Sequence, residues 1–126
     1  VRESITFSER SLFKDPDGHL RVGESLDANL VTNLKHHYAE LKAGQSIDKQ
    51  AFSNLYKQFG EATVRHFMVD FNKTLDLGMI KRKAADIGAS AVIKAINMAA
   101  DKIILNLNKD ELRAMAEYHD TLFYTE

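Results

Sequence analysis

The stretch that decides the fold runs from Met79 to Leu107 and reads MIKRKAADIGASAVIKAINMAADKIILNL. Apolar residues recur in it every three or four positions, which is the spacing of one face of an α-helix. That face is made up of Ile80, Ala84, Ile87, Ala91, Ala95, Met98 and Ile103. Other apolar residues cover much of the remaining circumference, and such a helix is expected to be buried on several sides. Either the other helices of this chain wrap it, or a second copy of the chain covers it.

Helices are also predicted on both sides of this stretch. Asp48 is the predicted N-cap of one helix, because Ile47 before it and Phe52 four residues after it match a hydrophobic staple. Gly60 marks either a helix end or a kink within one longer helix, since glycine costs only about 1 kcal/mol in a helix interior. The predicted ranges are Ser25 or Asp27 to Gly44, Asp48 to Gly60, Glu61 to Leu77, and Asn108 onward.

The last of these helices has the clearest start. Asn108 is its predicted N-cap, and Glu111 at the third helical position completes something like a capping box. The residues expected to face inward from this helix are Leu112, Met115, Tyr118 and Leu122.

Residues 1–23 differ from the rest, because apolar residues alternate there with polar ones and a turn interrupts them. The sequence Asp15-Pro16-Asp17-Gly18 suits a type I turn, in which proline presets φ and glycine accepts a positive φ. We therefore predict an N-terminal β-hairpin or extended arm over residues 1–23. The predicted fold is mainly α: one domain over residues 1–126, with residues 24–126 forming a bundle of four or five helices around the alanine-rich helix.

Composition narrows the possible functions. The chain has 126 residues, a formal net charge of −1 and no cysteine, which excludes disulfides, thiolate metal sites and a cysteine nucleophile. No apolar window is long enough to span a membrane, so we expect a soluble protein, with the cytoplasm as the favoured compartment. Because the first residue is Val1 rather than Met, we expect that the natural N-terminus has been removed, and the chain can be one piece of a larger protein.

Motifs for catalysis or metal binding are weak. Residues 13–24 align with a calcium loop through Asp15, Asp17 and Glu24, but Phe13 takes the first ligand position and Pro16 stiffens the bend. No phosphate-binding loop, nucleotide fingerprint or nucleophile elbow occurs. We expect no metal, cofactor, catalytic residue or small-molecule substrate, although an active site assembled from distant residues would leave no such motif.

The leading hypothesis is a non-catalytic protein–protein interaction module that associates with itself. Small side chains one turn apart let two helix backbones approach closely, inside a bundle or across a dimer interface. An exposed strand edge in the arm offers a second contact surface. The candidate interaction residues are Ile5, Phe7, Ala91, Ala95 and Ala99.

The alternative hypothesis is a nucleic-acid-binding helical domain. Basic residues gather at the start of the alanine-rich helix, and lysine and arginine neutralise the phosphates of a nucleic-acid backbone. The candidate residues are Arg65, Lys81, Arg82, Lys83 and Lys94. The same charges could instead pair with the acidic C-terminal helix, within one chain or between two, or lie on a solvated face.

Overall fold

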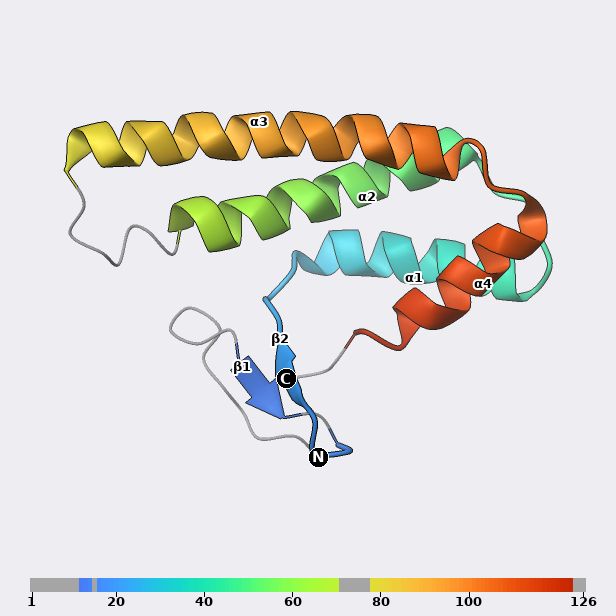
Figure 1. Cartoon of the computed structure of the whole chain (residues 1–126). Coiled ribbons are helices and arrows are strands. Elements are labelled where there is room, and N and C mark those ends of the chain that lie inside the picture. Colours follow the sequence, from blue (N-terminus) through green and yellow to red (C-terminus); the bar gives the residue numbers. More distant parts are fainter. Residues whose placement is uncertain (1–11, 15, 71–77, 124–126) are drawn as a thin grey trace.

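The computed structural model describes residues 12–14, 16–70 and 78–123. The elements are β1 (Leu12–Lys14), β2 (Leu20–Val22), α1 (Ala28–Lys42), α2 (Lys49–Val64), the π-helix η1 (Arg65–Asp70), α3 (Met79–Ile104) and α4 (Lys109–Asp120). Figure 1 shows α2 running beside α3, and α1 running beside α4. The described residues are therefore mainly α-helical, with four packed α-helices, as the sequence predicts.

The two short strands precede the helices. β1 and β2 pair antiparallel, with Phe13 opposite Arg21. Gly18 lies between them with a φ of 85°, a conformation that glycine adopts without strain. The predicted contact residues Ile5 and Phe7 lie outside the described residues.

Side-chain caps define where α1 and α2 begin. The Asp27 carboxylate accepts a hydrogen bond from the Leu30 amide at 3.2 Å, and Asp48 accepts one from the Gln50 amide at 3.0 Å. Each cap satisfies an amide that has no partner within its helix. Both N-caps are those that the sequence predicts, with Asp27 preferred over its alternative Ser25.

Gly60 does not end a helix. α2 passes through it and continues into η1, so the prediction of a helix boundary at Gly60 is wrong and the alternative of one longer helix is right. Gly60 is buried against Ile96 of α3. The glycine therefore serves a close helix–helix contact, which local sequence cannot distinguish from a helix end.

Two clusters of buried residues hold the helices together. The larger cluster joins α1, α2 and α4 with the last turn of α3, and it consists of Leu30, Leu34, Tyr38, Leu41, Phe52, Leu55, Ile104, Leu112 and Ala116. The smaller cluster joins the end of α2 to α3 through Val64, Ala89 and Ile93. Most of the core thus lies away from α3.

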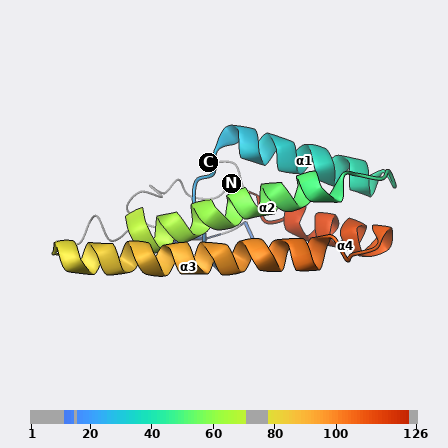
Figure 2. The same cartoon turned by 90° about the horizontal axis from the view of Figure 1, so that it is seen from above.

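α3 lies at the edge of the four helices. The prediction of a bundle arranged around it is therefore wrong. Its packing is chiefly against α2 and η1. Figures 1 and 2 show it along the outer edge of the four helices in both views. An apolar pattern around most of a helix indicates burial only if a partner is present, and this chain supplies a partner on one side.

α4 packs into the larger core cluster through a set of residues that differs in part from the predicted one: Leu112 and Met115 contribute as predicted, and Ala116 is added. The capping box is confirmed, because Asn108 accepts from the Glu111 amide and the Glu111 carboxylate accepts from the Asn108 amide. Leu112 and Ala116 are buried. The prediction that Tyr118 faces inward is wrong, since its side chain is 64% exposed. Leu122 is also exposed, because the helix ends before it.

Candidate interaction surface

Asp101 of α3 accepts hydrogen bonds from three residues of α2, and these bonds fasten the C-terminal part of α3 to α2. The Asp101 carboxylate accepts from Ser53 Oγ at 2.8 Å, from Lys57 Nζ at 2.7 Å and from Gln50 Nε2 at 3.2 Å. The bonds from Lys57 and then Ser53 hold the pKa of Asp101 below its ordinary value. With Asp101 directed at α2, Ala89 and Ile93 are buried in the same interface.

The side of α3 opposite Ala89 and Ile93 is apolar and exposed. Ile87 is 64% exposed and Met98 is 67% exposed. Single exposed apolar residues are ordinary, but a continuous exposed apolar surface is informative about binding. We call this surface the outer stripe, and its members are Ile80, Ala84, Ile87, Ala91, Ala95 and Met98, all of them exposed. No described residue covers it.

Three of the predicted interaction residues lie on α3 and are exposed. Ala91 and Ala95 belong to the outer stripe, and Ala99 lies beside it, one turn further along. The large members Ile87 and Met98 are not among the predicted interaction residues, although the helical periodicity places them on the same face. What the sequence could not supply was the direction of that face, which depends on where α2 packs.

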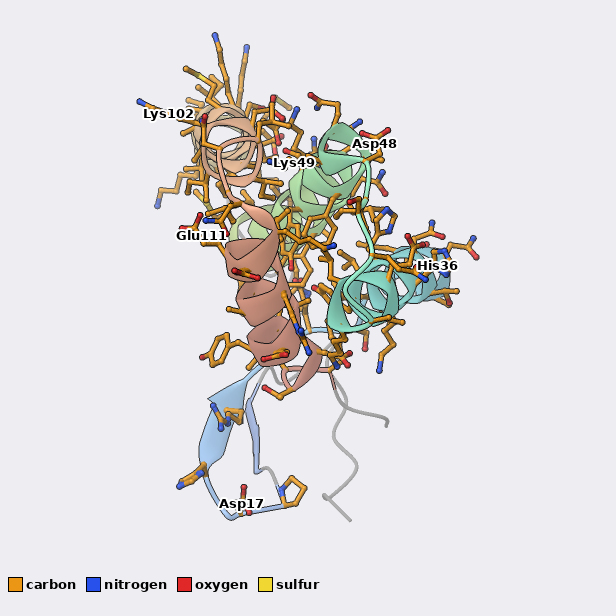
Figure 3. All side chains as sticks on the ribbon, turned by 90° about the vertical axis from the view of Figure 1, so that its right-hand side faces the viewer. Asp17, His36, Asp48, Lys49, Lys102 and Glu111 are labelled. Carbon is orange, nitrogen blue, oxygen red and sulfur yellow. The ribbon has the colours of Figure 1, made fainter. Side chains whose placement is uncertain are left out.

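Cations flank the outer stripe. Lys81, Arg82, Lys83, Lys94 and Lys102 are all exposed. Figure 3 looks toward the end of α3 and shows Lys102 on the side turned away from α2. Within the described residues, none of the five takes part in a salt bridge. Arg65 differs from them, because it pairs with Glu61 of α2 at 3.1 Å.

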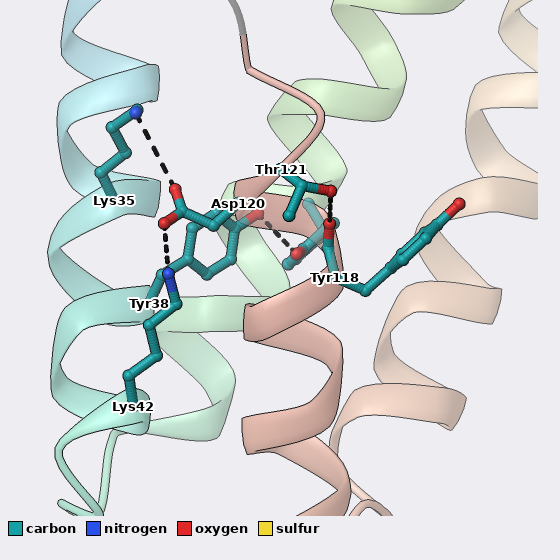
Figure 4. A network of polar contacts seen from close by, with 7 residues as sticks. Lys35, Tyr38, Lys42, Tyr118, Asp120 and Thr121 are labelled. Atoms are coloured by element: carbon teal, nitrogen blue, oxygen red, sulfur yellow. Dashed lines mark hydrogen bonds and ion pairs between the residues drawn. The ribbon is translucent and has the colours of Figure 1, made fainter. Parts of the chain in front are cut away.

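The acidic residues of α4 do not neutralise these cations within the described structure. Glu117 pairs with Arg113 of its own helix at 3.2 Å. Asp120 pairs with Lys42 and, at 3.8 Å, with Lys35 of α1. Figure 4 shows both lysines converging on Asp120. The salt bridges of α4 therefore fasten it to α1 and leave the start of α3 positively charged.

A row of hydrogen-bonded polar side chains crosses the larger core cluster. The Tyr38 and Tyr56 hydroxyls lie 2.7 Å apart, and the Tyr56 hydroxyl lies 2.7 Å from Nδ1 of His119. Burial lowers the pKa of His119, which favours the neutral imidazole, and burial raises the pKa of Tyr56 well above its ordinary value. These groups satisfy one another, which is what buried polar groups require. Their role in the described structure is to join α1, α2 and α4.

Other kinds of site find little support in residues 12–14, 16–70 and 78–123. No group of three or more His, Asp and Glu side chains there could hold a metal ion. No helix there combines the length and the apolar character needed to cross a bilayer. The outer stripe and its flanking cations are therefore the surface on which a functional argument can rest.

Comparison of the chain with protein-family models, with curated proteins and with solved structures finds no match. Function has to be inferred from the chemistry of the surface itself. That surface has two features: an apolar stripe along one side of a long helix, and beside it cations that form no salt bridge with a described residue.

Proposed function

We propose that this protein is a non-catalytic interaction module that associates with a second copy of itself through the outer stripe of α3. The observation that carries the proposal is the exposure of Ile87 and Met98 on the side of α3 opposite its packing against α2. Removing such side chains from water favours assembly, and this gain has to exceed the loss of translational and rotational freedom on association. Ala91 and Ala95 between them leave room for the backbone of another helix.

The shape of α3 supports the same function. It has 26 residues and is therefore about 39 Å long, so the stripe extends along a straight, continuous element. The stripe is turned outward because the other side of α3 packs on α2 through the buried Ala89 and Ile93 and through Ile96 against Gly60. The surface is thus already formed in the single chain, and binding does not require α3 to rotate or unfold.

The direct test is the absolute mass in solution, measured by light scattering behind a sizing column over a range of protein concentrations. We expect a mass of two chains for the unmodified protein. An Ala91→Glu variant is expected to have the mass of one chain, because it places a charge in the middle of the apolar contact.

A matched control is Ala114→Glu, which makes the same substitution at an exposed position of α4. It is expected to keep the mass of the unmodified protein. Circular dichroism must show equal helix content in both variants, so that loss of association is not loss of folding. An unmodified chain that has the mass of a monomer at every concentration contradicts the proposal.

The predicted arm residues Ile5 and Phe7 form a second part of this proposal. An arm that extends the contact between copies would bury these two apolar side chains as well. Deletion of residues 1–11 is then expected to weaken association without changing the helix content. If association is unchanged, the contact is confined to α3.

Nucleic-acid binding is the second candidate function. The observation that favours it is that Lys81, Arg82, Lys83 and Lys94 are exposed and form no salt bridge with a described residue. Binding to a short duplex is expected to fall steeply with salt, as counterion release requires. Replacing Lys81, Arg82 and Lys83 by alanine is expected to reduce it, and undetectable binding at low salt removes this candidate.

A further inference from the structure

Large and small side chains are distributed along the outer stripe in a self-complementary way. The large members are Ile80, Ile87 and Met98, and the small members are Ala84, Ala91 and Ala95. Ala91 lies at the centre, with Ile87 and Ala95 four residues from it on either side. Ala84 and Met98 are likewise each seven residues from Ala91, so Ile87 and Met98 each have an alanine at the mirror position, and Ile80 has Lys102.

We infer that two copies pack α3 against α3 in antiparallel orientation, with a two-fold axis at Ala91; this inference rests on the proposed self-association. In that register Ile87 lies opposite Ala95 of the second copy, and Ala84 lies opposite Met98 of the second copy. Ala91 lies opposite its own equivalent. Large side chains then fill the space beside small ones, which is how helices pack closely.

The polar residues beside the stripe fit the same register. Lys94 lies opposite Gly88 of the second copy, where the missing side chain leaves room for the lysine stem. Lys102 lies opposite Ile80 of the second copy, and its four-carbon stem covers apolar surface while the ammonium group stays in water. The long side chains near the interface therefore need no large rearrangement.

Charge also favours the antiparallel orientation. Lys81, Arg82 and Lys83 form a cationic cluster at the N-terminal end of α3. In the antiparallel pair the clusters of the two copies are separated by roughly 27 Å, since their centres are offset by about 18 residues. That distance exceeds the screening length of about 8 Å at physiological salt. Each cluster instead adjoins the C-terminal end of the other α3, where the helix dipole is negative and Lys102 is the one basic residue of the last turn.

Both side-chain packing and charge would disfavour a parallel pair of α3 helices. Ile87 would face Ile87 and Met98 would face Met98, which holds the helices apart and leaves space between the alanines. The two cationic clusters would also lie side by side, where like charges repel. Size and charge thus favour the same orientation.

Cysteine cross-linking tests the register directly, because the chain contains no cysteine of its own. Facing positions on two closely packed helices come within disulfide distance. Under mild oxidation, Ala91→Cys alone is expected to give a covalent dimer in high yield. Ile87→Cys alone and Ala95→Cys alone are expected to give little, whereas an equal mixture of these two variants is expected to cross-link.

A matched control for random collision is Ala114→Cys on α4, which is expected to stay uncrosslinked. Cross-linking of Ile87→Cys with itself, with none in the mixture beyond that background, would show a parallel pair and overturn the inference. If light scattering shows a dimer but none of these positions cross-links, the antiparallel register is overturned. The proposed self-association would still stand in that case. A monomer in light scattering removes the proposed function and the inference together.

Discussion

Gly60 of α2 lies so close to Ile96 of α3 that a β-carbon added at position 60 would stand 2.6 Å from the Ile96 Cγ2 atom. The isoleucine cannot move aside easily, because its β-branched side chain is stiff about χ1. It also packs against the smaller core cluster. The absence of a side chain at position 60 therefore determines how closely α2 and α3 approach.

Replacing Gly60 with alanine is expected to destabilise the protein. Overpacking costs about 1–3 kcal/mol, which opposes the gain of about 1 kcal/mol in helix propensity. Gly88→Ala is the control, since a β-carbon there meets only Met68 Cε at 3.9 Å within the chain. Both variants are compared in the Ala91→Glu background, so that a contact of Gly88 with a second copy does not enter. The Gly60 variant should be less stable than the Gly88 variant by about 1–3 kcal/mol in urea unfolding. Equal stabilities would contradict the close contact.

Asp101→Asn is expected to lower the unfolding midpoint at neutral pH. The substitution removes the charge that accepts from Lys57 and weakens the bond to the buried Ser53 hydroxyl. Because the folded-state pKa of Asp101 is lowered, its stabilising effect is present above its ordinary pKa of about 3.9 and is lost as the pH falls through the lower folded value. Asp86→Asn, on the same helix and without a described partner, should have little effect. Equal midpoints for both variants at pH 7 would count against the role given to Asp101.

His119 is expected to make stability depend on pH near neutrality. Burial lowers its pKa in the folded protein, so the unfolded chain takes up the proton more readily. Stability should therefore fall as the pH drops below the ordinary value of about 6.5 and level off once the folded form is also protonated. The measurement is urea unfolding of the unmodified protein and of His119→Gln from pH 7.5 to 5.

The comparison with His119→Gln isolates this group from other titrations. Burial raises the pKa of Glu24, whose ionisation therefore destabilises the fold as the pH rises. That contribution is common to both proteins and cancels in their difference. If the two proteins lose stability in parallel between pH 7 and 5, His119 is not the responsible group.

The thermal midpoint is expected to rise with protein concentration, because association through α3 involves the folded chain alone. Ala91→Glu should have a midpoint that is independent of concentration. Ala114→Glu should follow the unmodified protein. A concentration-independent midpoint for all three would indicate that the outer stripe stays in water.

Local sequence was sufficient to predict the ends of several helices. Asp27, Asp48 and Asn108 act as N-caps because each accepts from an amide within the next three residues, a contact that does not depend on the rest of the fold. Gly60 shows the limit of this reasoning. Its role is set by Ile96, which lies 36 positions away in the sequence and meets it only after α2 and α3 have packed.

The sequence predicts which residues share the candidate surface of α3, but not whether that surface faces the other helices or the solvent. Helical periodicity groups Ile87, Ala91 and Met98 on one face, and that grouping holds in the structure. That face stays exposed because α3 packs on α2 through its other side, where Ala89 and Ile93 are buried and Ile96 contacts Gly60. The chain of Tyr38, Tyr56 and His119 was not foreseen, because its members come from three helices and share no sequence spacing.

The two core clusters differ in size, and so the two halves of α3 are held with different strength. The smaller cluster has three buried residues, Val64, Ala89 and Ile93, and lies apart from the larger one. We therefore expect the N-terminal half of α3 to detach from α2 in a local opening that leaves the larger cluster intact. Its backbone amides should exchange with deuterium before those of α1. A second copy bound along α3 would slow that exchange, so the partner would act as a missing part of this half of the core.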